Sequence, residues 1–299
     1  CGITEEELLT QLKPDIERMA EANDETYEEA CLHLKRQYDG YHFSKACADI
    51  YNPFSLFNAF NSKEYKNYWF STGTPTFLID ILRHADFDVR ALEGVEATDE
   101  QFDAPTEQIT SPIPVLYQSG YLTIKEFDLE EMTFLLDFPN NEVKRGFLTM
   151  VASSYFDKTE TAAWIRKAAS QLKKGELDDF RAGLTSFLAS IPYTMRRKEN
   201  ERERERYFHY TFYLIMRLIS VYTVYTEKVQ SQGRVDCIVE TPNYVYIFEF
   251  KLDGTAAEAM RQIEEKGYAK EYGADARKLY QIGAVFSSET GTIEEWIVR

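Results

Sequence analysis

The chain has 299 residues, of which 44% are hydrophobic and 28% charged, and its net charge is −16. This composition excludes extended disorder and predicts a folded protein long enough for two domains. Because the chain lacks both an apolar run of about 18 residues and a basic-then-apolar leader, we expect a cytoplasmic protein that does not bind membranes.

The four cysteines, Cys1, Cys31, Cys47 and Cys237, form no C-x-x-C pair and have no histidine at zinc-ligand spacing. We therefore expect reduced thiols rather than disulfides or a structural zinc site. The chain begins at Cys1 without an initiator methionine and runs directly into a helical pattern, so we expect the C-terminal part of a longer protein.

The first elements are predicted to be helices. Apolar residues at helical spacing predict amphipathic helices over residues 4–22 and 25–37. Asn52-Pro53 marks a chain reversal before a short helix around residues 55–61. Thr74-Pro75 supplies a cap and a proline at the first helical position, which predicts a helix over residues 75–84.

The next segment has the pattern of a winged-helix module. Residues 114–136 read as a short helix followed by two strands that meet in a turn near residues 128–131. A helix follows from about residue 140 to 156, and two more fill residues 160–190. A winged helix can bind DNA, but the acidic surroundings favour a packing role.

A charged run, RRKENERERER, occupies residues 196–206 and reads as a solvated helix surface or a linker. We place the domain boundary there, between a helical region over residues 1–195 and a domain over residues 207–299. The second domain carries 10 Lys and Arg against 13 Asp and Glu, a net −3, so most of the acidity lies upstream. Since phosphate neutralisation drives nucleic-acid binding, this fragment alone is expected to bind nucleic acid weakly.

A helix over residues 207–222 precedes a predicted β-hairpin whose loop is Thr241-Pro242-Asn243-Tyr244. If the loop is centred between Pro242 and Asn243, the numbers of paired residues sum to 485. Ile238 then faces Ile247, and Asp236 faces Glu249. Period-two alternation puts Lys251 on the same sheet face as Glu249.

Two carboxylates facing each other at roughly 4.5 to 5.5 Å between Cβ atoms destabilise a sheet unless a cation lies between them. We expect Asp236 and Glu249 to bind Mg²⁺ or Mn²⁺, which would polarise a phosphate and activate water. Lys251 would position the water or stabilise the developing negative charge. The structural alternative is an ordinary salt bridge of Lys251 with Glu249 or Asp236 at a strand end.

This hairpin, a following helix over residues 256–272 and a late strand over residues 282–287 resemble the PD-(D/E)XK nuclease superfamily. The resemblance covers about the last hundred residues. It implies a restriction-endonuclease-like α/β domain with a central mixed sheet after a mostly helical N-terminal region, and metal-dependent phosphodiester hydrolysis of nucleic acid.

The resemblance also implies further site residues. It places an acid on the helix before the hairpin, which Glu205 matches, and Glu227 matches a second acidic position. Gln262 would reach the site from the following helix. Tyr268 lies six residues beyond Gln262 rather than four, which departs from the pattern of many superfamily exonucleases.

Upstream phrases resemble bacterial proteins that join an AAA-ATPase-like domain to such a nuclease-like domain: YDGYHF at 38–43, YNPFSLFNAF at 51–60, YWFSTGTPTFLI at 68–79 and QSGYLTI at 118–124. The phosphate-binding loop G-x-x-x-x-G-K-[ST] is absent from the chain. ATP binding is therefore expected only with an upstream phosphate-binding loop, and an upstream ATPase-like domain is the expected partner.

Other interpretations stay open. The nuclease-like fold can serve as a non-catalytic regulatory or interaction scaffold, or the winged-helix segment can bind DNA without cleavage. His209 on an amphipathic helix is read as a core or boundary residue, and the turn at residues 71–74 as a helix cap rather than a phosphate site.

Overall fold

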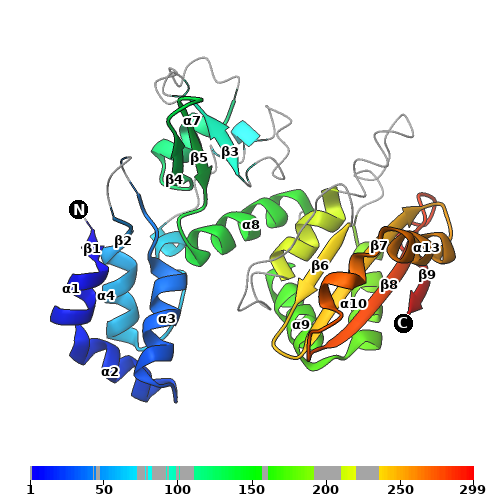
Figure 1. Ribbon diagram of the computed structural model, residues 1–299, viewed down its shortest axis with the longest axis horizontal. Coiled ribbons are helices and arrows are strands. Elements are labelled where there is room, and N and C mark those ends of the chain that lie inside the picture. Colours follow the sequence, from blue (N-terminus) through cyan, green and yellow to red (C-terminus); the bar gives the residue numbers. More distant parts are fainter. Residues whose placement is uncertain are drawn as a thin grey trace. The chain divides into compact units, whose positions relative to one another are not determined.

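A computed structural model describes most of the chain, which divides by its contacts into two units, Cys1–Val151 and Ala152–Arg299. Figure 1 shows the elements of both units in chain order. Within the described ranges, no helix is both long and apolar enough to span a membrane. Those ranges are residues 2–42, 44, 48–72, 78, 80–82, 92, 94–98, 101, 111–156, 161–191, 210–219 and 236–299.

The first unit begins with a short strand and three helices rather than the two helices expected. Its elements are β1 (Ile3–Thr4), α1 (Glu5–Gln11), α2 (Lys13–Ala22), α3 (Tyr27–Tyr38), β2 (Ile50–Tyr51), α4 (Pro53–Ser62) and the 3₁₀ helix η1 (Trp69–Thr72). The predicted helix over 4–22 is divided at Leu12. Pro14 lies in the first turn of α2, where its missing N–H costs nothing, whereas inside a continuous helix it would remove a hydrogen bond.

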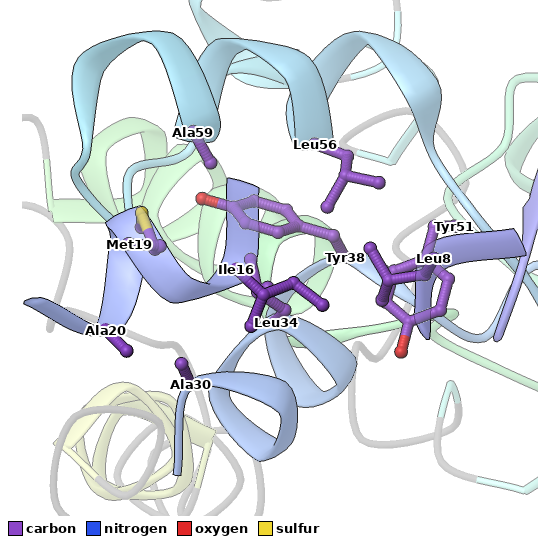
Figure 2. Close-up of a cluster of buried hydrophobic side chains, with 10 residues drawn as sticks. All are labelled: Leu8, Ile16, Met19, Ala20, Ala30, Leu34, Tyr38, Tyr51, Leu56 and Ala59. Atoms are coloured by element: carbon purple, nitrogen blue, oxygen red, sulfur yellow. The ribbon is translucent and has the colours of Figure 1, made fainter. Parts of the chain in front are cut away.

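Helix caps explain where these helices start. Thr4 and Thr26 each form a capping box with the glutamate three residues later, and Asn52 accepts hydrogen bonds from the first turn of α4. Inside, one apolar cluster joins the four helices to β2 (Figure 2). Its members are Leu8, Ile16, Met19, Ala20, Ala30, Leu34, Tyr38, Tyr51, Leu56 and Ala59.

The second half of the first unit holds a three-stranded antiparallel sheet in the order β3-β5-β4. Its elements are β3 (Val95–Ala97), α7 (Ile113–Gln118), β4 (Thr123–Asp128) and β5 (Thr133–Asp137). The predicted order of a short helix and two paired strands is confirmed. The assignment of these elements to a winged-helix module stays a prediction.

Helix α8 (Asn141–Phe156) follows, and the division between the units falls inside it. In the second unit, α9 (Thr161–Lys174) and α10 (Leu177–Ala189) precede the sheet, and residues 210–219 are also helical. The expected linker at 196–206 lies outside the described residues. Contacts group α9 and α10 with the sheet, so the division falls earlier in the chain than the one expected from sequence.

The sheet of the second unit is mixed, as expected for the fold class. Strands β6 (Cys237–Glu240), β7 (Tyr244–Leu252), β8 (Lys278–Phe286) and β9 (Ile293–Val298) lie in the order β6-β7-β8-β9. β7 and β8 are parallel, and the outer pairs are antiparallel. The β7–β8 crossover contains α13 (Ala256–Lys266) and the 3₁₀ helix η4 (Tyr268–Tyr272).

The predicted single helix over 256–272 is interrupted at Gly267. Gly267 adopts a left-handed conformation with φ of 67°, which ends α13 before η4 begins. Strand β9 was not predicted from the sequence pattern. It pairs with β8, and its four middle residues alternate poorly between apolar and polar side chains.

Both faces of the central strand β7 are covered. On one face, Val245 and Ile247 pack with Ile238 and with Met260 and Ile263 of α13. On the other, Phe248 meets the ring of Phe180 in α10, and the Tyr246 hydroxyl donates a hydrogen bond to the Leu172 carbonyl in α9 at 2.6 Å. A strand buried in this way carries near-continuous apolar residues, and a charged side chain on it needs a specific partner.

Candidate active site

The hairpin register is confirmed over the whole β6–β7 ladder. Ile238 pairs with Ile247, and the last pair is Cys237 with Phe248, each summing to the predicted 485. Asp236 lies one residue before the ladder, in a bend. Its Oδ2 accepts a hydrogen bond from the Phe250 backbone N–H at 2.7 Å, so its carboxylate is held against β7.

Glu249 lies near the middle of β7 with only 1% of its surface exposed. Burial and, to a lesser extent, the negative charge of Asp236 raise its pKa to about 7, although Lys251 and the backbone N–H of Asp236 oppose both effects. The two carboxylates are near enough for their charges to interact. Asp236 precedes the last ladder pair, Cys237 with Phe248, so its predicted direct pairing with Glu249 is not part of the ladder.

The two oxygens of Glu249 differ in their partners. Oε1 accepts a hydrogen bond from Lys251 Nζ at 3.3 Å. Oε2 is buried and accepts no hydrogen bond from the described residues. A buried carboxylate oxygen without a donor is costly, and it is the kind of group that binds a cation.

Glu240, the other buried acid of the same hairpin, shows what a structural carboxylate looks like in this domain. Arg277 donates to its Oε2 at 2.7 Å, and the Tyr272 hydroxyl donates to its Oε1 at 3.1 Å. Both oxygens of Glu240 are therefore paired. The contrast sets Glu249 apart as an acid that is not fully used by the fold.

Gln262 of α13 is in contact with Lys251 of β7. Lys251 Nζ donates to Gln262 Oε1 at 2.6 Å, so the ammonium lies between the α13 amide and the Glu249 carboxylate. About 29% of the lysine side chain is exposed, which leaves it accessible from solvent. The contact between Lys251 and Glu249 is the salt bridge of the structural alternative, and the active-site interpretation includes the same contact.

Several predicted site residues cannot be placed. Glu205, Glu227 and His209 lie outside the described residues. Tyr268 lies in η4 and packs against the apolar cluster beneath α13, and its role in the site stays a prediction. Within the part of the chain that the structure describes, no group of three or more His, Cys, Asp or Glu side chains is arranged to hold a metal ion.

Asp236 and Glu249 would supply two of the ligands that a divalent cation needs. Both are hard oxygen donors of the type that Mg²⁺ and Mn²⁺ prefer, and Glu249 has an unused buried oxygen. A complete site would need a third protein ligand or water. Cys237 pairs with Phe248 and therefore lies on the sheet face opposite Glu249.

Sequence reasoning missed Gly283. It pairs with Glu249 across the parallel β7–β8 ladder. A Cβ at this position would lie 2.6 Å from the Ala256 carbonyl oxygen and 2.9 Å from Met260 Cγ, so only glycine lets α13 approach the sheet beside Glu249. A glycine inside a strand is a known sign of close backbone approach, and that signal could have identified it.

Comparison with known proteins supports the same part of the chain. Residues 203–296 match the family model of the PD-(D/E)XK nuclease superfamily. A protein of Azotobacter chroococcum mcd 1, described as "Uncharacterized protein in vnfD 5'region", is 30% identical over 306 residues. That alignment covers 100% of this chain and 56% of the relative, so the chain spans little more than half of the relative's length. No solved structure matches the chain.

Proposed function

We propose that residues 203–296, a PD-(D/E)XK nuclease superfamily domain, hydrolyse phosphodiester bonds of nucleic acid with a divalent metal ion. The observation that carries the proposal is the unpaired, buried Oε2 of Glu249 beside Asp236, with Lys251 on the same sheet face. A fold that needed these groups only for stability would pair them fully, as it pairs Glu240.

Asp236 and Glu249 are the proposed metal ligands. A bound divalent cation would polarise the scissile phosphate and lower the pKa of the attacking water. The bond between phosphorus and the leaving sugar oxygen would break as the water oxygen bonds to phosphorus, with the proton of the water released to solvent and the leaving oxygen protonated from solvent. The Lys251 ammonium neutralises negative charge that develops on the phosphoryl oxygens, and Gln262 holds that ammonium in place.

Metal binding and cleavage can be measured separately. We expect Mn²⁺ or Mg²⁺ to bind in a calorimetric titration and Asp236→Asn to abolish that binding, because a neutral amide is a poor ligand for a hard cation. Cleavage of single-stranded and duplex DNA and of RNA should require the metal. It should fall by at least about a hundredfold in Lys251→Ala, the size of effect typical for a lost charge-stabilising group.

The matched control is Glu289→Gln, an acid-to-amide change on an exposed loop of the same domain. It should bind metal and cleave like the unchanged protein. Metal binding without cleavage of any nucleic acid would favour a non-catalytic scaffold. Cleavage that survives Asp236→Asn and Lys251→Ala would reject these residues as the site.

We also propose that the domain works with an ATPase-like module, on the strength of the sequence phrases at 38–43 and 118–124. The relative is longer than this chain, which leaves room in it for such a module. ATP-stimulated cleavage by a polypeptide that contains both modules, lost when a phosphate-binding lysine is replaced, would support this partnership. Cleavage indifferent to ATP would argue against it.

A further inference from the structure

A row of residues crosses the sheet from the site to its edge. Lys251 on β7 pairs with Val285 on β8, and Val285 pairs with Glu295 on β9. Directly paired residues on neighbouring strands point to the same face. Glu295 therefore lies on the face that α13 covers, two strands away from Lys251.

Glu295 holds the first residue of α13. Its Oε2 accepts a hydrogen bond from the Ala256 backbone N–H at 2.8 Å. This N–H is one of the four that a helix leaves without an intrahelical partner. The capping box of Thr255 and Glu258 uses the N–H groups of those two residues, so Ala256 depends on β9.

Helix α13 also carries Gln262, the residue that contacts Lys251. From the anchored Ala256, α13 crosses the sheet where Gly283 lacks a side chain, and less than two turns later Gln262 meets Lys251 Nζ at 2.6 Å. Because α13 is a rigid element, a change at its first residue shifts the Gln262 amide relative to the lysine.

Another contact ties α13 to the end of the sheet. Arg299 forms an ion pair with Glu264, and both side chains are more than half exposed. Exposed ion pairs contribute little to stability, so this pair is a weak restraint. The Glu295 bond is part-buried and made to the backbone, which makes it the stronger anchor.

We infer that Glu295 is a positioning residue that sets the location of the Lys251 ammonium by anchoring α13, and with it Gln262, to β9. The catalytic consequence rests on the proposed nuclease function, whereas the placement of Lys251 does not. Glu295 touches neither acid of the site in any described contact and acts only through the helix.

The experiment measures Lys251 directly. Competitive acetylation with a small amount of acetic anhydride, followed by mass spectrometry, reports how readily each lysine amine reacts. We expect Glu295→Ala and Gln262→Ala each to raise the rate at Lys251 severalfold, since both free the amine from the amide. Glu295→Gln should leave the rate unchanged, because its amide oxygen still accepts the Ala256 N–H.

The double variant Gln262→Ala/Glu295→Ala should react at Lys251 like Gln262→Ala alone, since residues that act through one contact are not additive. Glu294→Ala, the neighbouring acid on the other face of β9, is the control and should change nothing at Lys251. The acetylation rates of Lys270 and Lys278 show whether the whole domain has become less stable.

An unchanged Lys251 rate in Glu295→Ala would overturn the inference. So would an equal rise at Lys270 and Lys278, since Glu295 would then merely stabilise the domain. Absence of nuclease activity in all proteins would count against the proposed function, and the acetylation rates would still decide the role of Glu295.

Discussion

At the residue scale, the informative feature is an acid that the fold buries without pairing fully. Glu249 is almost wholly inaccessible, and its pKa of about 7 shows that the ionised form is disfavoured at its position. Burying an unpaired charge costs free energy, and such strain is typical of residues retained for chemistry. Glu240 is also buried, but both of its oxygens are paired, with Arg277 and Tyr272.

This strain predicts a pH-dependent stability of the metal-free protein. The folded-state pKa of Glu249 is raised from 4.5 to about 7, so the folded state binds more protons than the unfolded state between those values. The stabilising contribution is complete below about pH 4.5 and is lost as the pH rises through 7. Glu249→Gln, neutral at every pH, should gain stability relative to the unchanged protein by on the order of 3 kcal/mol from pH 5 to pH 8.

Urea unfolding at pH 5 and pH 8 in the presence of a chelator measures this difference. Glu289→Gln, which removes an exposed carboxylate, should show no comparable trend. If Glu249→Gln and the unchanged protein lose stability in parallel between the two pH values, the raised pKa is contradicted.

At the element scale, α13 determines the position of one side of the site. Its capping box and the Glu295 bond define its start, Gly267 defines its end, and Gly283 lets it approach β8. The result is that Gln262 reaches Lys251 over the same sheet face that carries Glu249. The crossover between parallel strands thus completes a site that the hairpin begins.

Gly283→Ala should displace α13. The added Cβ would meet the Ala256 carbonyl oxygen, a backbone atom that cannot move without the helix. We expect a loss of about 1 to 3 kcal/mol in the free energy of unfolding, together with faster acetylation of Lys251. Thermal and urea unfolding test the first expectation, and mass spectrometry tests the second.

Gly273→Ala is the matched control, because Gly273 has a φ of −64° and its added Cβ would lie 3.4 Å from the nearest atom. It should change stability by no more than about 0.5 kcal/mol. Equal stabilities of the two alanine variants would show that α13 tolerates the extra methyl group and that Gly283 does not control its approach.

At the scale of the whole chain, the sheet of the second unit needs the helices that precede it. Phe248 meets Phe180 of α10, and the ring of Tyr244 lies over Gly175, which follows α9. These contacts cover the face opposite α13. A nuclease-like fragment cut at the charged run would lose that cover and expose an apolar sheet face to water.

Two fragments test this requirement. Residues 152–299 should fold cooperatively, whereas residues 207–299 should aggregate or lack fixed side-chain packing, because the face of Tyr246 and Phe248 is then exposed. Near-ultraviolet circular dichroism and urea unfolding of both fragments measure the difference. Cooperative unfolding of 207–299 with native near-ultraviolet signals would contradict the need for α9 and α10.

Much of the candidate site followed from sequence because its geometry is local. A tight hairpin loop determines the register of both strands, and the period of two then determines which side chains share a face. That reasoning predicted the pairing from Glu240–Val245 to Cys237–Phe248 and the shared face of Glu249 and Lys251. The expectation that Gln262 reaches the site came instead from the family resemblance, and its contact with Lys251 came from the structure.

The tertiary structure alone determined the contacts between elements that lie far apart in the chain. The position of β9, the anchoring of α13 by Glu295 and the cover supplied by α9 and α10 have no local pattern, since they depend on which surfaces meet after the chain folds. The sequence by itself determined the hairpin, its register and its acids. Only the packing of distant elements decided that Glu249 is buried with an unpaired oxygen, because burial and hydrogen bonding are properties of the folded surroundings.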